Sequence, residues 1–118
     1  MLMNYYKELN TMVILIENNL KNKISYTDLA QAVDFSIPHV REIFRVRFKK
    51  PLARYILERK ISHIAYQLSQ SNKSLVVLAL DYGFETYEVF IRAFKHITGM
   101  TLSKFRKGFG SVSIGYMS

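Results

Sequence analysis

Residues 29–55 of this chain read LAQAVDFSIPHVREIFRVRFKKPLARY, and residues 78–105 read LALDYGFETYEVFIRAFKHITGMTLSKF. The two stretches match at apolar positions, which pair as Leu29 with Leu78, Ala30 with Ala79, Phe35 with Phe84, Val40 with Phe90, Phe44 with Phe94, Leu52 with Leu102 and Tyr55 with Phe105. The spacing between partners is 49 residues as far as Phe84 and 50 residues from Phe90 onward. One residue has therefore been gained in the turn or at the start of the following helix, where loops tolerate insertions. Such a repeat indicates one structural unit that occurs twice.

Each copy has the pattern of a helix-turn-helix. In the first copy, Ser25 with Asp28 three residues later predicts the start of a short helix. Ser36 then predicts the cap of the next helix, and Pro38 falls in its first turn, where a missing amide costs little. Asp34 stands in the turn where a left-handed residue is expected, and Gly83 holds the matching place in the second copy.

The remaining residues predict helices around the two copies. Apolar residues at helical spacing predict an amphipathic helix over 4–20, and Pro51 can start a long helix through about Gln70. The sixth helix is expected to be capped near Glu85 or Thr86 and to end at Gly99. The sequence thus predicts an all-α fold of about seven helices: a helix-turn-helix subdomain over 1–50, a linker helix over 51–71, a second subdomain over 72–108, and a flexible tail or the start of a missing domain over 109–118.

Composition favours a polyanionic partner. The chain has 118 residues, 17 Lys and Arg against 9 Asp and Glu, a formal charge of +8 and a pI near 9.8. Between residues 36 and 60 the count is eight basic to two acidic residues, so most of the net charge lies on the first copy and the helix after it. The absence of cysteine excludes disulfides, thiolate metal sites and thiol nucleophiles. No apolar run approaches the roughly 20 residues that span a bilayer, so a cytoplasmic protein without membrane contact is expected.

Catalytic and metal-binding patterns are not evident. His39, His63 and His96 share no ligand spacing, and no carboxylates cluster with them in the sequence. The chain has no Gly-rich phosphate loop, paired catalytic carboxylates or Ser/His/Asp constellation. We therefore expect neither an enzyme nor a cofactor nor a metal site.

Further residues carry a resemblance to the AraC/XylS family of bacterial transcription regulators. They are Tyr82-Gly83-Phe84, Ile91-Arg92-Ala93-Phe94-Lys95, Gly99 and Phe105-Arg106, at the spacing of that family's signature. Residues 55–72 add a similarity to the small activators of the MarA, SoxS and Rob type. The resemblance implies a monomer that places two recognition helices, joined by a rigid helix, in successive major-groove segments of double-stranded DNA, about 34 Å apart. It also implies contact with RNA polymerase.

The resemblance and the exposed sides of the two helices select the candidate DNA-binding residues. On the first recognition helix these are Ser36, Pro38, His39, Arg41, Glu42 and Arg45. On the second they are Thr86, Tyr87, Glu88, Ile91, Arg92 and Lys95. Phosphate contacts are expected from Lys49, Lys50, Arg54, Lys104 and Arg106. Arg41 and Arg92 are the strongest base readers, because an arginine fork matches the guanine edge and can discriminate by about 1–3 kcal/mol.

Several of these residues keep a second interpretation. Glu88 can pair with Arg92 on a solvated face, and Glu42 can pair with Arg45 or Arg41, instead of accepting from cytosine. Pro38 can be a helix-start residue only. Ile91 can contact a thymine methyl group, face a partner, or pack against the fourth helix.

The reading faces depart from the small activators that the chain resembles. Those relatives tend to have Trp, Gln and Arg where this chain has Pro38, Arg41 and Glu42, and Gln in place of Glu88. Their operator is therefore not carried over, and two unlike faces favour an asymmetric site, with most of the grip from the first copy. The leading hypothesis is a sequence-specific transcription regulator that acts as an activator. The alternative is a helical interaction module or anti-regulator that binds polymerase or another regulator without reading DNA.

Overall fold

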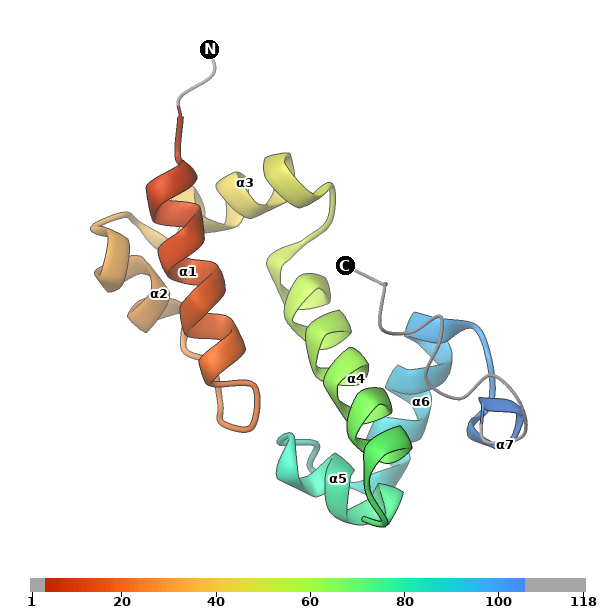
Figure 1. The fold of residues 1–118 in the computed structure, drawn as a ribbon. Helices are drawn as coiled ribbons and strands as arrows, with labels where there is room; N and C mark the ends of the chain where they lie inside the picture. Colours follow the sequence, from red (N-terminus) through yellow and green to blue (C-terminus); the bar gives the residue numbers. More distant parts are fainter. Residues whose placement is uncertain (1–3, 106–118) are drawn as a thin grey trace. The chain divides into compact units, whose positions relative to one another are not determined.

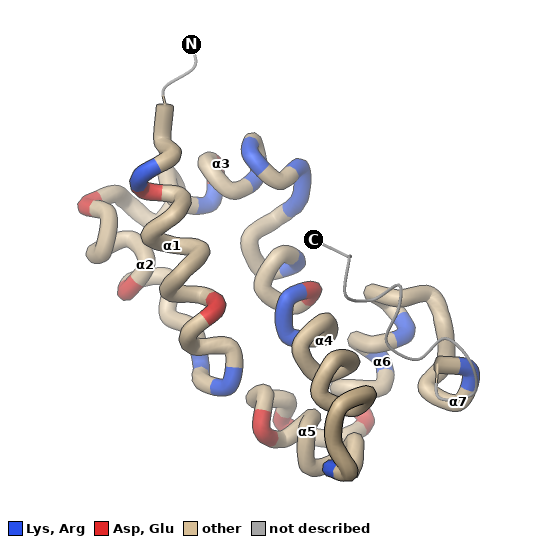
Figure 2. Tube along the Cα trace, viewed as in Figure 1, with Lys and Arg blue, Asp and Glu red and all other residues tan. Residues whose placement is uncertain are grey.

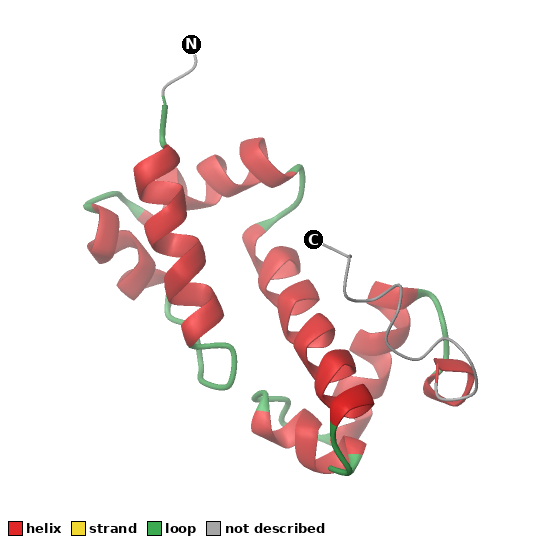
Figure 3. Cartoon of the chain, viewed as in Figure 1, coloured by secondary structure: helices red, strands yellow, loops and turns green. Residues whose placement is uncertain are grey.

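A computed structural model describes residues 4–105 as helices joined by short loops (Figures 1 and 3). Within this range there are seven helices and no strand, which confirms the predicted fold class. They are α1 (Tyr6–Asn18), α2 (Tyr26–Val33), α3 (Ile37–Phe48), α4 (Leu52–Gln70), α5 (Leu75–Asp81), α6 (Tyr87–Thr98) and α7 (Leu102–Lys104). The chain divides into two compact units, the first ending at Ile56 and the second beginning at Leu57. The predicted linker helix corresponds to α4, which begins in the first unit and continues into the second.

The first unit packs α2 against both α1 and α3. Its core contains Met12, Ile16, Val40 and Phe44, all fully buried. Burial of a side chain of this size contributes roughly 1.5–3 kcal/mol, so these residues account for much of the unit's stability. Tyr55 closes the core, with its ring 5.3 Å from that of Phe44.

The second unit repeats this core with one more aromatic ring, because Phe90 takes the place of Val40. Phe90 and Phe94 of α6 are buried, with their ring centroids 5.9 Å apart. Phe105 lies edge-on to Phe94 at 5.5 Å, in the place that Tyr55 takes in the first unit. Ile61 and Ile64 of α4 are also fully buried. The apolar repeat in the sequence therefore becomes two equivalent cores.

The turns of the two units share one hydrogen-bond pattern. Phe35 N–H donates to the Ala30 carbonyl at 3.0 Å, and Phe84 N–H donates to the Ala79 carbonyl at 3.1 Å. The helix after each turn begins at a hydroxyl cap, Ser36 in one unit and Thr86 in the other, as predicted. The first helices are capped alike, by Ser25 and Ser74. Because Phe84 matches Phe35 and Thr86 matches Ser36, the additional residue is Glu85.

Each unit has two left-handed residues, and each of them lies at or directly after the end of a helix. Asp34 (φ 60°) ends α2, and its partner Gly83 (φ 85°) follows α5, which confirms the interpretation of both residues. Gly99 (φ 74°) ends α6, also as predicted. Lys49 (φ 61°) ends α3 at the position equivalent to Gly99 and was not expected there. L-residues adopt this conformation at a cost of roughly 1–2 kcal/mol, which glycine avoids.

The first helix is shorter than the expected range of 4–20. It begins at Tyr6, whose N–H donates to Asn4 Oδ1 at 3.0 Å, so Asn4 lies before the helix. It ends at Asn18, because Asn19 N–H donates to the Ile16 carbonyl in a tighter turn. Likewise Pro51 precedes α4: its carbonyl accepts the first helical bond, from Tyr55 N–H at 3.0 Å. The tail over 109–118 lies outside the described residues.

Candidate nucleic-acid interface

The exposed side of α3 carries the candidate residues of the first unit. Pro38, Arg41, Glu42 and Arg45 are exposed, whereas Val40, Ile43 and Phe44 face the core. Lys and Arg residues recur along α3 and into the loop after it (Figure 2). The burial pattern that holds α3 in the unit therefore leaves a cationic side accessible.

Glu42 and Arg45 form an ion pair on this side. Arg45 Nη2 lies 2.7 Å from Glu42 Oε2, and Arg45 Nε donates to Glu42 Oε1 at 3.2 Å. The hydrogen bonds to Glu42, and then its charge, raise the pKa of Arg45 above the ordinary value for arginine. Both side chains remain more than half exposed, at 56% for Glu42 and 61% for Arg45. Glu42 therefore pairs with Arg45 in the absence of DNA, as one interpretation of the sequence expected. Both of its carboxylate oxygens accept hydrogen bonds from Arg45.

Arg41 is also engaged within the first unit. Its guanidinium lies over the Tyr26 ring of α2, 5.1 Å from the centroid, where cation–π attraction holds it. The side chain is exposed, so the guanidinium can leave the ring for a base edge at the cost of this contact. At exposed sites such a contact contributes about 0.5–1 kcal/mol, less than a bidentate guanine contact.

His39 belongs to a cluster of three rings. Its ring lies 4.4 Å from that of Phe35 and 5.3 Å from that of Tyr5, and Tyr5 lies 5.5 Å from Phe35. The residue is half-buried, and its N–H donates to the Ser36 cap at 3.2 Å. These contacts give His39 a packing role at the start of α3, where it joins α3 to the residues before α1.

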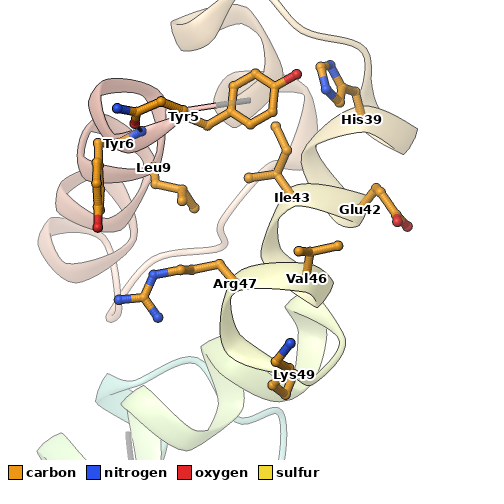
Figure 4. A pocket seen from close by; sticks show the side chains of 10 residues that line it. Tyr5, Tyr6, Leu9, His39, Glu42, Ile43, Val46, Arg47 and Lys49 are labelled. Carbon is orange, nitrogen blue, oxygen red and sulfur yellow. Dashed lines mark hydrogen bonds between the residues drawn. The ribbon is translucent and has the colours of Figure 1, made fainter. Parts of the chain in front are cut away.

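An open groove adjoins the same side of α3 (Figure 4). Leu9, Ile43 and Val46 supply its apolar wall, and Arg47 and Lys49 lie at its border. The guanidinium of Arg47 lies 5.0 Å from the Phe48 ring centroid. Arg47 is an exposed cation on α3 that was counted in the basic stretch of the sequence but was not among the expected contact residues.

In the second unit, α6 presents its candidate residues from one exposed side. Thr86, Glu88, Arg92 and Lys95 are exposed, and Thr86 Oγ1 accepts from Val89 N–H at 3.1 Å. Tyr87 is half-buried, with its ring stacked 6.1 Å from that of Phe90.

The sequence allowed more than one interpretation of Ile91 and of the pair Glu88 and Arg92. The structure contradicts one interpretation in each case. Ile91 is 38% exposed, which contradicts burial against the fourth helix. No ion pair between Glu88 and Arg92 occurs in the described structure, unlike the pair between Glu42 and Arg45. The second reading face therefore presents its arginine and its carboxylate separately.

The expected phosphate contacts fall at the ends of helices. Lys49 is exposed at the end of α3, Lys104 is exposed in α7, and Lys50 and Arg54 are half-buried near the start of α4. Arg106 lies outside the described residues.

Lys60 has a structural position that its charge alone did not indicate. Its ammonium donates to the Tyr82 carbonyl at 3.0 Å, and a Cβ at Gly83 would lie 3.3 Å from the same nitrogen. Burial lowers the pKa of Lys60 below the ordinary lysine value. The side chain therefore fastens the turn before α6.

Residues 4–105 contain no group of three or more His, Asp or Glu placed to hold a metal ion. No helix in this part of the chain has the length and apolar character needed to cross a membrane.

Comparisons with known proteins agree with this geometry. A family model described as a helix-turn-helix domain matches residues 29–108. The transcriptional activator AarP of Providencia stuartii is 32% identical over 98 residues, which cover 83% of this chain and 73% of that protein. The multiple antibiotic resistance protein MarA of Escherichia coli is 32% identical over 91 residues, covering 77% and 72%.

Solved structures show the same fold. A Chromobacterium violaceum regulator with an AraC-type DNA-binding domain superimposes with a TM-score of 0.78 at 25% identity, covering 85% of this chain and 89% of that one. The C-terminal domain of a Fusobacterium nucleatum response regulator gives 0.74 at 23% identity. The matched range begins within α2 and includes both turns and both helices that follow them, α3 and α6. This chain therefore belongs to the AraC-type family of helix-turn-helix transcription regulators, which bind DNA.

Proposed function

We propose that this chain activates transcription as a monomer that reads an asymmetric promoter site with α3 and α6 and contacts RNA polymerase with another surface. The observation that carries the proposal is that each unit presents a recognition helix with an exposed arginine, Arg41 on α3 and Arg92 on α6. An arginine fork in the major groove selects guanine through its O6 and N7 atoms. The two helices belong to one chain and present different side chains. The DNA site that they contact therefore need not be a palindrome.

The charge distribution supports different contributions of the two units to DNA binding. Residues 36–60, which include α3 and the start of α4, carry eight basic and two acidic residues, so this stretch supplies most of the phosphate attraction, which does not depend on sequence. In the second unit, Glu88, Ile91 and Arg92 are exposed together and offer an acceptor, an apolar contact and a donor fork to base edges. The second unit then contributes mainly to selectivity.

Activation is supported by the relatives, since AarP is named a transcriptional activator. An activator that binds upstream of a promoter raises transcription by contacting polymerase, which requires a protein-binding surface apart from the recognition helices. We further propose that the protein acts in the cytoplasm and catalyses no reaction.

The test is selection of bound duplexes from a random pool, followed by sequencing and by salt titration of selected and random duplexes. We expect an asymmetric consensus, a stoichiometry of one chain to one duplex, and a preference for the consensus that survives rising salt. Loss of all sequence preference once salt suppresses phosphate contacts would contradict specific reading. Binding to polymerase without any duplex binding would favour an interaction module instead.

A further inference from the structure

The guanidinium of Arg41 is held by a residue of another helix. It lies 5.1 Å from the centroid of the Tyr26 ring, and Tyr26 is the first residue of α2. Within residues 4–105 the structure shows no ion pair of Arg41, so this ring is the contact that positions its side chain. Arg45, by contrast, is held by Glu42 of α3 itself. The position of Arg41 in the free chain therefore depends on the packing of α2 against α3.

The Tyr26 ring lies on the side of α2 that faces the core of the first unit. Tyr26 precedes Leu29 by three residues and Ala30 by four, and both of these are buried. Tyr26 itself is half-buried, whereas Arg41 is exposed. A base edge lies in the major groove, beyond the exposed side of a recognition helix. A guanidinium over the ring is thus turned back toward its own unit, and it has to leave the ring to reach a guanine.

The second unit shows that the fold needs neither member of this contact. When the helix caps are aligned, Leu75 takes the place of Tyr26, and it is 2% exposed. When the apolar repeat is aligned, Ile91 takes the place of Arg41. A buried aliphatic side chain therefore completes α5 at this position, and the recognition helix after it has no cation at the matching place. The ring and the arginine occur together in the first unit and are both replaced in the second.

We infer that Tyr26 is a positioning residue for DNA binding, which acts through Arg41 and lowers the affinity for the selected site. This inference rests on the proposed function, because it requires that Arg41 reads a base. In the free chain the ring holds the guanidinium, and a guanine contact has to replace that cation–π attraction. On a duplex without that guanine, Arg41 can stay on the ring and loses nothing. The ring therefore weakens the selected complex more than a nonspecific one, and it reduces the preference at one base pair.

The test removes the ring with Tyr26→Leu, which introduces the residue that the second unit has at this place. Tyr26→Phe keeps the aromatic face and should behave as the wild type, because cation–π attraction needs the ring and not the hydroxyl group. Tyr6→Leu, at a tyrosine of α1 that is 72% exposed, is the matched control for the loss of a tyrosine. Each change is also made together with Arg41→Ala, which removes the guanidinium. Circular dichroism and thermal unfolding verify that every variant folds.

Equilibrium binding is measured on the selected duplex, on the same duplex with each base pair exchanged in turn, and on a random duplex. We expect Tyr26→Leu to tighten binding to the selected duplex by about two- to fivefold, the range that a cation–π contact at an exposed site provides. The gain should be smaller on the random duplex and on the duplex changed at the base pair that Arg41→Ala relaxes. Together with Arg41→Ala, Tyr26→Leu should change nothing. A merely structural role of Tyr26 would not make its effect depend on Arg41.

Three results would overturn the inference and leave the proposed reading intact. Weaker binding of Tyr26→Leu to the selected duplex would show that the ring supports the guanine contact. Unchanged binding would show that the ring and the base do not compete for Arg41. A gain that persists together with Arg41→Ala would show that Tyr26 acts through another residue. The proposed reading has its own test, because Arg41→Ala alone must lower affinity and relax one base pair; if it does neither, Arg41 reads no base and the inference falls with that part of the proposal.

Discussion

The two helix-turn-helix units share a backbone frame but differ in what they place on it. Both use a hydroxyl cap before each helix of the helix-turn-helix and a left-handed residue in the turn between them. The first unit fills its two left-handed positions with Asp34 and Lys49, whereas the second uses Gly83 and Gly99. Apolar spacing and caps are therefore sufficient for the frame, and the other positions are free to diverge.

The reading faces differ in a second way, through their internal contacts. In the first unit Arg45 is held by Glu42 and Arg41 lies over Tyr26. In the second unit no such contact of Arg92 is seen among residues 4–105. The first unit must exchange protein contacts for DNA contacts, whereas the second presents its arginine directly. This difference bears on binding, while the left-handed positions bear on stability.

The largest expected effects come from the two cores. Phe44→Ala and Phe94→Ala should each destabilise their own unit by about 3–5 kcal/mol, because both rings are buried and a cavity remains. Chemical unfolding with amide hydrogen exchange resolved along the chain measures this. Val46→Ala, an exposed truncation, should stay within about 0.5 kcal/mol of the wild type. Equal loss of protection in both units from either phenylalanine variant would show that they unfold as one.

Base reading by the second unit should give the next largest effect. Arg92→Ala should cost about 1–3 kcal/mol on the selected duplex and relax preference at one base pair, because it removes a guanidinium fork. Lys104→Ala, also exposed in that unit, should weaken all duplexes alike and reduce the salt slope by about 1. Competition binding with single-base variants of the duplex compares the two. An unchanged base preference in Arg92→Ala would remove that residue from the reading face.

The left-handed positions should respond in opposite directions. Gly99→Ala should destabilise the chain by about 1–2 kcal/mol, since a Cβ there meets nothing within 4 Å and the strain is purely conformational. Lys49→Gly should stabilise it by about 0.5–1 kcal/mol, because relief of strain exceeds the added entropy of the unfolded chain. Lys49→Ala is the control, since it removes the charge but keeps a Cβ. Thermal unfolding distinguishes them, and a gain from Lys49→Ala equal to that from Lys49→Gly would assign the effect to charge.

The smallest effect is expected at the ion pair of the first unit. Glu42→Gln should free Arg45 for phosphate or base contact, and so raise affinity for all duplexes modestly and steepen the salt dependence. Glu88→Gln removes a carboxylate that no described arginine pairs with, so it isolates the change in net charge. Equilibrium binding at several salt concentrations measures both variants. Selective loss of one base preference in Glu42→Gln would instead identify Glu42 as a reader.

Much of the frame could be predicted from the sequence because it follows from local chemistry. Ser36 as a cap, Asp34 in the turn and Gly99 at a helix end are all confirmed, since each depends on residues within one turn. The paired apolar residues located both cores, because helical spacing sorts buried from exposed positions. Which side chains contact DNA stays a prediction, since the described structure contains no DNA.

What the sequence did not show depends on contacts across helices or on strain. Lys49 carries no local sign of a left-handed conformation, and its equivalence with Gly99 was the one clue. The hydrogen bond from Lys60 to Tyr82 joins residues 22 apart, beyond any periodicity. The ring cluster likewise brings Tyr5, which precedes α1, against Phe35 and His39 at the start of α3. Glu42 and Glu88 looked alike in the sequence, and only side-chain placement distinguishes them.

The single additional residue Glu85 limits how parts of the two units can be exchanged. A one-residue shift along a helix turns each side chain by about 100° around the axis, since there are about 3.6 residues per turn. A reading face transplanted from α3 to α6 in register with Phe35 and Phe84 would place core residues in solvent. Transplanted in register with the caps Ser36 and Thr86, the same residues keep their orientation. Chimaeric regulators with altered operators are therefore to be designed by aligning caps.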